Sequence, residues 1–389
     1  MVDANPLVAR MRGFGTSVFA EMSALAVRTG SINLGQGFPD TDGPPELLEA
    51  AVEAIRAGHN QYPPGAGIPE LRRAVAAHQE RWYGQRVDPD TEVLITAGAT
   101  EATTAAVLAL TGPGDEVIFF EPYFDTYPAA VALAGATRRV VALRREQSRW
   151  TFDPAELRAA VGPRTRLILL NTPHNPTGKV FDATELQLIA DLAVEHDLLV
   201  LTDEVYEHLV FDGEHRPLAT LPGMAERTLI AGSAGKTFAV TGWKIGWLIA
   251  PARLVTAVRA VKQMLTYVNG APFQPAVALG LGLPDAYFAA TAGALRDRRD
   301  QLCTGLAAAG FDVVVPQATY FAMADVGRDG VEFCRALPAA TGVVAIPGSV
   351  FYDSSAGDHL IRFAFCKRPE VVAEAVRRLT EAAAGETIR

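Results

Sequence analysis

The sequence predicts an α/β protein with a mostly parallel central sheet, to which a smaller α+β domain is attached. Short apolar segments alternate with longer amphipathic segments through residues 45–283, and this rhythm changes after about residue 283. The apolar segments are hydrophobic almost throughout, which is typical of parallel strands buried on both faces. Regular alternation of such strands with helices favours a sheet covered by helices on both sides. With 389 residues, the chain is long enough for two domains.

The elements of the larger part follow in order. The predicted strands are residues 92–96, 116–121, 166–171, 198–203, 228–232 and 245–250. The predicted helices are residues 45–57, 69–83, 99–110, 183–196 and 252–268. Helices are distinguished from strands here by length and by apolar residues spaced three or four positions apart.

The smaller part combines a long Arg-rich helix with short strands. Its predicted helices are residues 286–309 and 370–384, and its predicted strands are residues 311–315, 320–324, 342–345 and 360–365. We expect residues 45–283 to form the large domain and residues 284–389 the small one. Residues 1–44 are expected to be an N-terminal arm and part of the small domain, since their Gly- and Pro-rich end is typical of a crossing loop.

The composition argues against several classes of protein. Hydrophobic residues make up 49% of the chain and charged residues 20%, so disorder is excluded as the main state. A net charge of −9 argues against a nucleic-acid or anionic-membrane partner. No apolar segment predicts a membrane span or a signal peptide. The 3 cysteines, widely spaced, predict neither a disulfide framework nor a metal site, so we expect a cytoplasmic protein without a metal.

Polar side chains follow three successive predicted strands at their carboxyl ends. They are Asn175 in N-P-T-G, Asp203 and Tyr206 in D-E-V-Y, and Ser233, Lys236 and Lys244 in S-A-G-K-T-F-A-V-T-G-W-K. Each motif alone has an ordinary structural explanation, as a turn, a helix start or a solvated loop lysine. Ligands bind at the carboxyl ends of parallel strands, so the order and placement of the motifs together indicate one site.

The segment G-S-A-G-K-T, residues 232–237, resembles a phosphate-binding loop only in part. That loop requires G-x-x-x-x-G-K-[ST], and its first glycine is replaced here by Ile230. The residues that follow, F-A-V-T-G-W, are also a poor start for the long helix that such a loop needs. Both differences argue against a nucleotide hydrolase.

Taken together, the three motifs resemble those of the fold-type I, pyridoxal-phosphate-dependent aminotransferases of class I/II. The resemblance runs from Asn33 to Phe363, nearly the whole chain. It implies the three-layer fold of that group and pyridoxal 5′-phosphate as cofactor. It also implies ping-pong transfer of an amino group from a glutamate-type L-amino acid to a 2-oxo acid, in a homodimer with shared active sites.

The resemblance implies catalytic roles for the polar residues. Lys236 would bond to the cofactor aldehyde and carry a proton to and from the substrate. Asp203 would pair with the ring nitrogen of the cofactor, and Tyr206 and Asn175 would donate hydrogen bonds to its ring oxygen.

Further residues would hold the rest of the cofactor. Phe124 would stack on its ring, with the neighbouring Tyr123 as the alternative. The phosphate would be bound by Ser233, Lys244, the backbone of Ala99 and Thr100, and Tyr62 of the other subunit.

The substrate carboxylate has its own predicted partners. Arg362 would bind it bidentately, and Gly37 would let the backbone approach it, with Asn175 beside them. No Arg or Lys lies between Lys262 and Arg296, where a second carboxylate-binding arginine would fall, which argues against aspartate as the main substrate.

The rest of the substrate pocket is predicted more loosely. Tyr267, Phe273 and Phe14 are candidates to line it, and each is equally compatible with a place in the core. Whole-chain similarity favours the actinobacterial N-succinyldiaminopimelate aminotransferases of lysine biosynthesis.

Three alternatives stay open or are disfavoured. The kynurenine/glutamine/methionine aminotransferases, which double as cysteine-conjugate β-lyases, remain the alternative branch, and a dedicated β-lyase would share every cofactor residue. A transcriptional regulator with an aminotransferase-like domain would need a basic helix-turn-helix domain before Asn33, and none is predicted.

Overall fold

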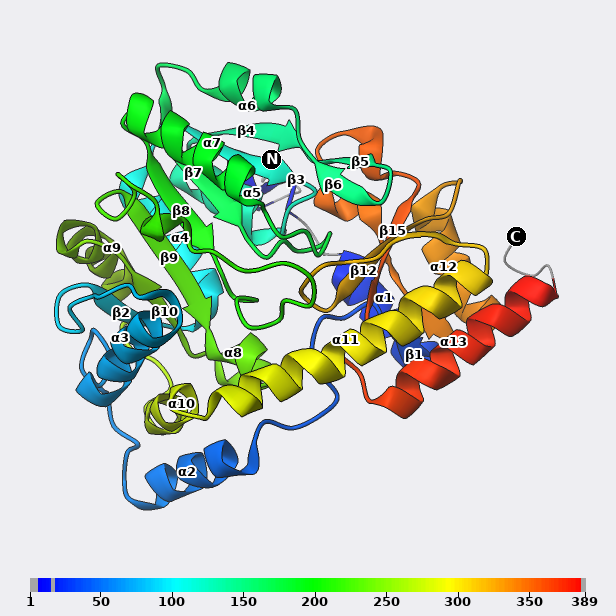
Figure 1. Cartoon of the computed structure of the whole chain (residues 1–389), viewed down its shortest axis with the longest axis horizontal. Helices are drawn as coiled ribbons and strands as arrows, with labels where there is room; N and C mark the ends of the chain where they lie inside the picture. Colours follow the sequence, from blue (N-terminus) through cyan, green and yellow to red (C-terminus); the bar gives the residue numbers. More distant parts are fainter. Residues whose placement is uncertain (1–5, 15–17, 386–389) are drawn as a thin grey trace.

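A seven-stranded sheet lies at the centre of the computed structural model, which describes residues 6–14 and 18–385 (Figure 1). The strand order is β2-β10-β9-β8-β7-β3-β4. The strands are β2 (Val93–Thr96), β3 (Glu116–Glu121), β4 (Thr137–Ala142), β7 (Thr165–Asn171), β8 (Leu199–Asp203), β9 (Thr228–Ser233) and β10 (Gly246–Ile249). Only β10 runs antiparallel to its neighbours. The predicted α/β fold with a mostly parallel sheet is confirmed.

The two faces of this sheet bury different sides of the same strands. Val117 and Phe119 of β3 pack with the helices α4 (Gly98–Leu110), α5 (Thr126–Ala134) and α9 (Ala252–Leu265). Ile118 and Phe120 face the opposite core, which contains α7 (Ala183–Glu195) and continues into the small domain. This two-sided burial explains why the inner strands of the sheet are largely apolar, and it forms three layers.

Local signals set several helix boundaries. The Asp182 side chain accepts hydrogen bonds from the backbone N–H groups of Thr184 and Glu185, and Glu185 accepts one from Asp182 N–H, so α7 begins with a capping box. The predicted helix 252–268 is too long, because α9 ends at Leu265. Lys262 Nζ donates to the carbonyl of Tyr267 (2.7 Å), and Tyr267 itself has a left-handed backbone (φ 64°), which no helix continues.

A four-stranded antiparallel sheet forms the core of the smaller part. Its order is β11 (Asp312–Val314), β12 (Phe321–Asp325), β15 (Leu360–Ala364) and β14 (Ile346–Pro347). The helices α11 (Asp285–Ala308), α12 (Gly330–Thr341) and α13 (Pro369–Ala384) cover it. The other helices and strands are α2 (Pro45–Arg56), α3 (Pro69–Tyr83), α6 (Pro154–Ala160), α8 (Ala234–Thr237), α10 (Phe273–Leu281), β5 (Arg144–Glu146) and β6 (Arg149–Thr151).

The N-terminal segment packs with C-terminal elements. The helix α1 (Val18–Thr29) contacts α12, and β1 (Ile32–Asn33) pairs in parallel with β13 (Val343–Val344). Figure 1 shows this blue segment among the orange and red elements. The domain bounds 1–44, 45–283 and 284–389 stay a proposal, which this pairing supports. In the part of the chain that is described, no helix combines the length and the apolar character that a membrane span requires.

We predict that Gly246→Ala destabilises the protein, because β10 and the start of α4 touch at this glycine. A Cβ atom at Gly246 would lie 2.6 Å from the carbonyl carbon of Gly98 and 2.8 Å from the nitrogen of Ala99. Overpacking of this kind costs about 1–3 kcal/mol, which should lower the midpoint of thermal unfolding. The matched control is Gly112→Ala, because no atom lies within 4 Å of that Cβ position. Equal midpoints for the two variants would contradict the prediction.

Candidate active site

A cavity of about 310 Å³ opens where β7, β8 and β9 end, between the central sheet and the small domain. Most of the residues that the sequence predicted for the site line it. They are Gly37, Ala99, Thr100, Phe124, Asn175, Asp203, Tyr206, Ser233, Lys236, Lys244 and Arg362. Residues far apart in the sequence are therefore brought to one place, as the three motifs at the carboxyl ends of parallel strands indicated.

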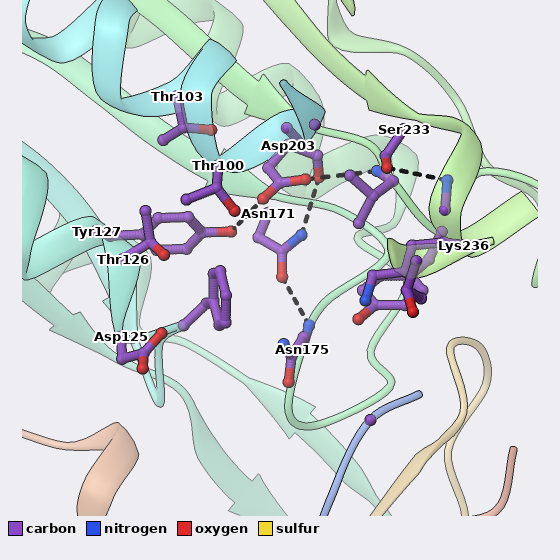
Figure 2. A pocket seen from close by; sticks show the side chains of 18 of the residues that line it. Thr100, Thr103, Asp125, Thr126, Tyr127, Asn171, Asn175, Asp203, Ser233 and Lys236 are labelled. Atoms are coloured by element: carbon purple, nitrogen blue, oxygen red, sulfur yellow. Dashed lines mark hydrogen bonds between the residues drawn. The ribbon is translucent and has the colours of Figure 1, made fainter. Parts of the chain in front are cut away.

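The register of the sheet sets the middle of the cavity. Asn171, the last residue of β7, is the neighbour of Asp203 at the end of β8. The Asn171 side chain donates to the carbonyl of Asp203 (2.9 Å) and accepts from the N–H of Asn175 (2.7 Å), as Figure 2 shows. Asn171 therefore ties the two loops that carry Asn175 and Asp203. The sequence analysis did not single it out, although it ends the predicted strand 166–171.

Asp203 is a buried carboxyl group, and no cation of the described residues forms an ion pair with it. Burial raises its pKa to about 6, against the opposing effect of a hydrogen bond from Tyr127. That hydroxyl donates to Asp203 Oδ2 at 2.8 Å. A carboxylate held in this way attracts a positively charged nitrogen in a ligand, because the pair would form out of water.

Lys236 lies on the short helix α8, directly after β9. Its Nζ is 6.0 Å from the centre of the Tyr206 ring and 5.7 Å from that of Tyr320, and no described residue is its hydrogen-bond partner. Burial lowers its pKa from 10.5 to about 8. A substantial fraction of the amine is therefore neutral near physiological pH, which suits a nucleophile and a proton carrier.

One end of the cavity is built for an anion. The helix α4 begins there, and its first N–H groups, including those of Ala99 and Thr100, have no partner within the helix. Lys244 reaches the same point, because a Cβ added to Gly98 would lie 3.3 Å from its Nζ. Lys244 has a left-handed backbone (φ 53°), an uncommon conformation for a lysine that places its side chain here. The Ser233 hydroxyl also lines this cavity.

Arg362 supplies a second cation from β15 of the small domain. It is fully buried, and it donates to Asn175 Oδ1 (3.0 Å) and to the carbonyl of Gly35 (3.1 Å). Its guanidinium lies 3.9 Å from the centre of the Phe321 ring and 4.7 Å from that of Phe351. Among the described residues, no carboxylate forms an ion pair with it, and its Nε has no partner. Burial lowers its pKa to about 10. The Arg362 guanidinium therefore lacks a counter-ion, and a negatively charged ligand can supply one.

The structure separates the aromatic candidates. Phe124 lines the cavity, whereas the Tyr123 hydroxyl turns away to donate to Asp353 (2.6 Å). Phe14, Tyr267 and Phe273 are absent from the cavity lining within the described residues. Phe19 and Phe321, which the sequence analysis did not name, line the cavity instead, because α1 and β12 border it.

Tyr62 also lies outside this cavity. Its side chain is 81% exposed and contacts the ring of Tyr267 edge-on, with centroids 5.5 Å apart. Its expected role toward the phosphate of another subunit stays a prediction, which its exposure allows.

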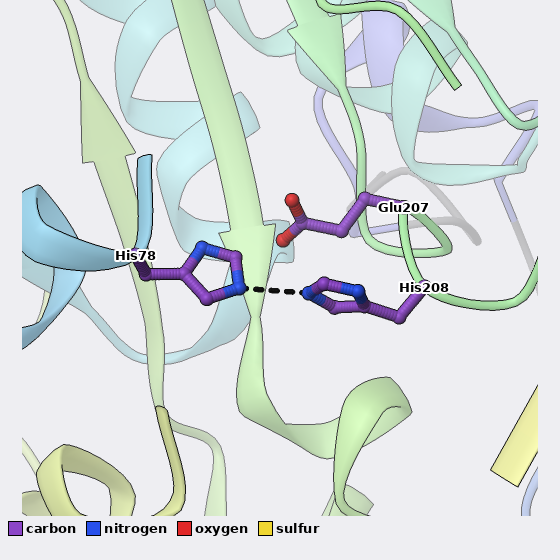
Figure 3. A group of neighbouring side chains, drawn as sticks. All are labelled: His78, Glu207 and His208. Atoms are coloured by element: carbon purple, nitrogen blue, oxygen red, sulfur yellow. Dashed lines mark hydrogen bonds between the residues drawn. The ribbon is translucent and has the colours of Figure 1, made fainter. Parts of the chain in front are cut away.

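A second polar cluster is formed by His78, Glu207 and His208, outside the lining of the cavity (Figure 3). The Nε2 atoms of the two histidines share a hydrogen bond of 2.7 Å. Two nitrogens bound to one tetrahedral zinc ion would be about 3.3 Å apart, given bonds of about 2.0–2.1 Å. Tyr83 also donates to Glu207 (2.6 Å), whose pKa burial raises to about 7. The cluster is therefore arranged as a hydrogen-bonded link between α3 and the turn after Tyr206.

Comparison with known proteins identifies the family of the chain that forms this cavity. Residues 29–379 match the family model for aminotransferase class I and II. The chain belongs to that family. It is 55% identical to a probable N-succinyldiaminopimelate aminotransferase of Mycobacterium tuberculosis, over 96% of this chain and 98% of the relative. It is 38% identical to a kynurenine–oxoglutarate transaminase of Dictyostelium discoideum, over 91% of each chain.

Solved structures agree with the sequence comparison. The N-succinyldiaminopimelate aminotransferase of M. tuberculosis superimposes with a TM-score of 0.95 at 55% identity, covering 97% of this chain and 100% of that one. A methionine aminotransferase from Escherichia coli gives a TM-score of 0.92 at 39% identity, covering 97% and 100%. The protein is therefore an aminotransferase with the fold of that family, as the three motifs indicated.

The lowered pKa of Lys236 predicts selective chemical labelling. In the cofactor-free aminotransferase, a small amine-reactive reagent should modify Lys236 increasingly as the pH rises through about 8, whereas an ordinary lysine reacts through about 10.4. Mass spectrometry of the labelled Lys236 peptide at each pH measures this profile. A Lys236 profile centred near the ordinary value would contradict the electrostatics described above.

Proposed function

We propose that this aminotransferase uses pyridoxal 5′-phosphate and transfers an amino group by a ping-pong mechanism, from a glutamate-type donor to a 2-oxo acid. The observation that carries the proposal is the gathering of buried charges around one cavity, which Asp203, Lys236 and Arg362 all line. Each of these charges is held away from water, and within the part of the chain that the structure describes none has a partner of opposite sign in contact. A charged cofactor and a charged substrate would supply those partners.

The groups that line the cavity fit each part of this cofactor. The start of α4, Ser233 and Lys244 suit the phosphate. Asp203 suits the ring nitrogen in its protonated form, and Phe124 offers an aromatic face for stacking. When bound, pyridoxal phosphate supplies a ring that withdraws electrons from the substrate α-carbon.

The residues of the chain have separable tasks in this reaction. Lys236, with a pKa of about 8, can accept a proton and return it within the range of physiological pH. Arg362 binds the α-carboxylate in a bidentate manner, and Asn175 and the surrounding aromatic rings fix the guanidinium before the substrate arrives. Tyr206 keeps its hydroxyl proton, because burial raises its pKa, and so it acts as a hydrogen-bond donor.

We propose N-succinyldiaminopimelate and its 2-oxo acid as the substrate pair, which assigns the enzyme to lysine biosynthesis. The support is the identity of 55% with the M. tuberculosis relative of that name, against 38–39% for the kynurenine and methionine aminotransferases. The absence of Arg and Lys between Lys262 and Arg296 argues against aspartate as the main substrate.

A second candidate is a kynurenine, glutamine or methionine aminotransferase with cysteine-conjugate β-lyase activity. The observation that favours it is the apolar part of the cavity, which contains Phe19, Phe124 and Phe321. Aromatic and thioether side chains bind well to such surfaces. Those relatives also match nearly the whole chain.

We further propose a homodimer with shared active sites. The exposed pair of rings formed by Tyr62 and Tyr267 supports it, since clusters of large apolar side chains on the surface mark interfaces. Light scattering should give twice the chain mass of 41.5 kDa, and Tyr62→Ala should weaken cofactor retention. A monomer with a fully retained cofactor would overturn this proposal.

The substrate assignment is tested by the visible spectrum of the cofactor-loaded enzyme during addition of single donors. N-succinyl-L,L-diaminopimelate and glutamate should remove the visible absorption of the lysine-bound cofactor without a coupled assay. Kynurenine, glutamine and methionine should convert it far more slowly. The opposite order of rates would establish the second candidate, and release of pyruvate from a cysteine conjugate would show lyase activity.

Two variants serve as controls for this experiment. Lys236→Ala should lose the visible absorption and the turnover, because the covalent bond to the cofactor cannot form. Arg362→Lys should keep the absorption but raise KM for every donor, since lysine cannot copy the bidentate contact. If the parent protein showed no absorption after addition of pyridoxal phosphate, the cofactor proposal itself would fail.

A further inference from the structure

Tyr127, which the sequence analysis did not identify, makes the shortest side-chain contact with Asp203 in the described cavity. Its hydroxyl donates to Asp203 Oδ2 at 2.8 Å, and Figure 2 shows the two groups facing each other beside Asn171. Tyr127 is 2% exposed and packs against the Phe119 ring from α5. Burial and the nearby carboxylate raise the pKa of Tyr127 well above 10, so the phenol stays protonated and can only donate to Asp203.

This contact leaves one oxygen of Asp203 weakly engaged. Among the described residues, Oδ1 receives only a long contact of 3.4 Å from the N–H of Val205, while Tyr127 holds Oδ2. A donor N–H in the cavity can therefore bond to Oδ1 without competing with Tyr127. The carboxyl group is fixed at one oxygen and open at the other.

The hydrogen bond also affects the charge of Asp203. Burial raises the pKa of this carboxyl group to about 6, and the Tyr127 hydroxyl opposes that shift, together with the Val205 N–H and the charge of Lys236. The neighbouring Glu204 acts in the other direction. Tyr127 is thus the group on α5 that favours the ionised form of the Asp203 carboxyl group.

We propose that Tyr127 is a positioning residue for the aminotransferase reaction, which holds the Asp203 carboxylate ionised and in one orientation, so that the proton between Asp203 and the cofactor ring nitrogen stays on the nitrogen. This inference rests on the proposed function. No proton is gained or lost by Tyr127, because its O–H bond stays intact and only the position of the shared proton changes.

The residue proposed to stack on the cofactor ring lies just before the same short helix. Phe124 lies three positions before Tyr127, and their rings meet edge-on with centroids 5.8 Å apart. A ligand ring in contact with Phe124 would therefore lie against a side chain that packs on Tyr127, the residue that orients Asp203. The face and the nitrogen of the ring are recognised through one segment of the chain.

The test compares Tyr127→Phe with the parent enzyme loaded with pyridoxal phosphate labelled with nitrogen-15. In the parent, the nitrogen NMR signal should be that of a protonated ring. In Tyr127→Phe it should move toward the unprotonated position, because the carboxylate becomes more basic without its donor. Cofactor release should also become about tenfold faster or more, as expected for loss of a hydrogen bond to a charged group.

Tyr123→Phe is the matched control, since it removes another buried hydroxyl that donates to an aspartate, Asp353, away from the cavity. It should leave the nitrogen signal and the release rate unchanged. Identical nitrogen signals in the parent and Tyr127→Phe would overturn this inference while leaving the proposed function intact. A parent protein that binds no cofactor would instead refute the proposed function.

Discussion

The buried charges of the cavity are the constraint on which the rest of the structure depends. Asp203, Lys236 and Arg362 are each removed from water, and no described residue of opposite charge is in contact with them. Such burial opposes the charged form of each group. The chain stabilises them with neutral partners: the Tyr127 hydroxyl for Asp203, and an amide oxygen, a carbonyl and aromatic rings for Arg362. These partners come from α5, the loop after β7, the N-terminal segment and β12, so elements of the large and small domains must pack together before the charges can be held. The two hydrophobic cores on the faces of the central sheet supply the stability that offsets this arrangement.

The positions of the strands in the sheet explain how residues far apart in the sequence meet at the cavity. Neighbouring strands end at the same level, so the Asn171–Asp203 pair is set by parallel register rather than by loop length. The antiparallel β10 then returns the chain toward the start of α4, and Gly246 leaves room for that contact. Arg362 enters from the opposite side on β15, which makes the cavity a junction between two separately built sheets.

The parts of the fold that sequence could predict are those with strong local signals. Six strands of the central sheet are largely apolar, and the sequence analysis located them closely. The seventh strand, β4, has the sequence T-R-R-V-V-A and lies exposed at the sheet edge, so it lacks that signal. The polar residues after the strands were predicted because strand ends are visible in the sequence. Tyr127 was missed because its role depends on a contact across 76 positions, and an aromatic residue in an apolar helix is most often core. The aromatic residues that line the cavity could not be chosen correctly from the sequence. Phe14 and Phe19 are the same residue type, and only Phe19 lies in α1, which borders the cavity.

The parallel pairing of β1 with β13 has a consequence for the order in which the protein is made. Ile32 pairs with Val343, so the partner of an early strand emerges from the ribosome about 310 residues later. At about 5–20 residues per second, that delay is roughly 15–60 s. The central sheet can assemble in this interval, whereas the apolar side of α1, which carries Met22 and Ala26, waits for C-terminal elements to cover it. Nascent chains of this protein therefore pass through a stage in which the sheet is folded and the N-terminal helix is exposed, and during that stage they are candidates for chaperone binding.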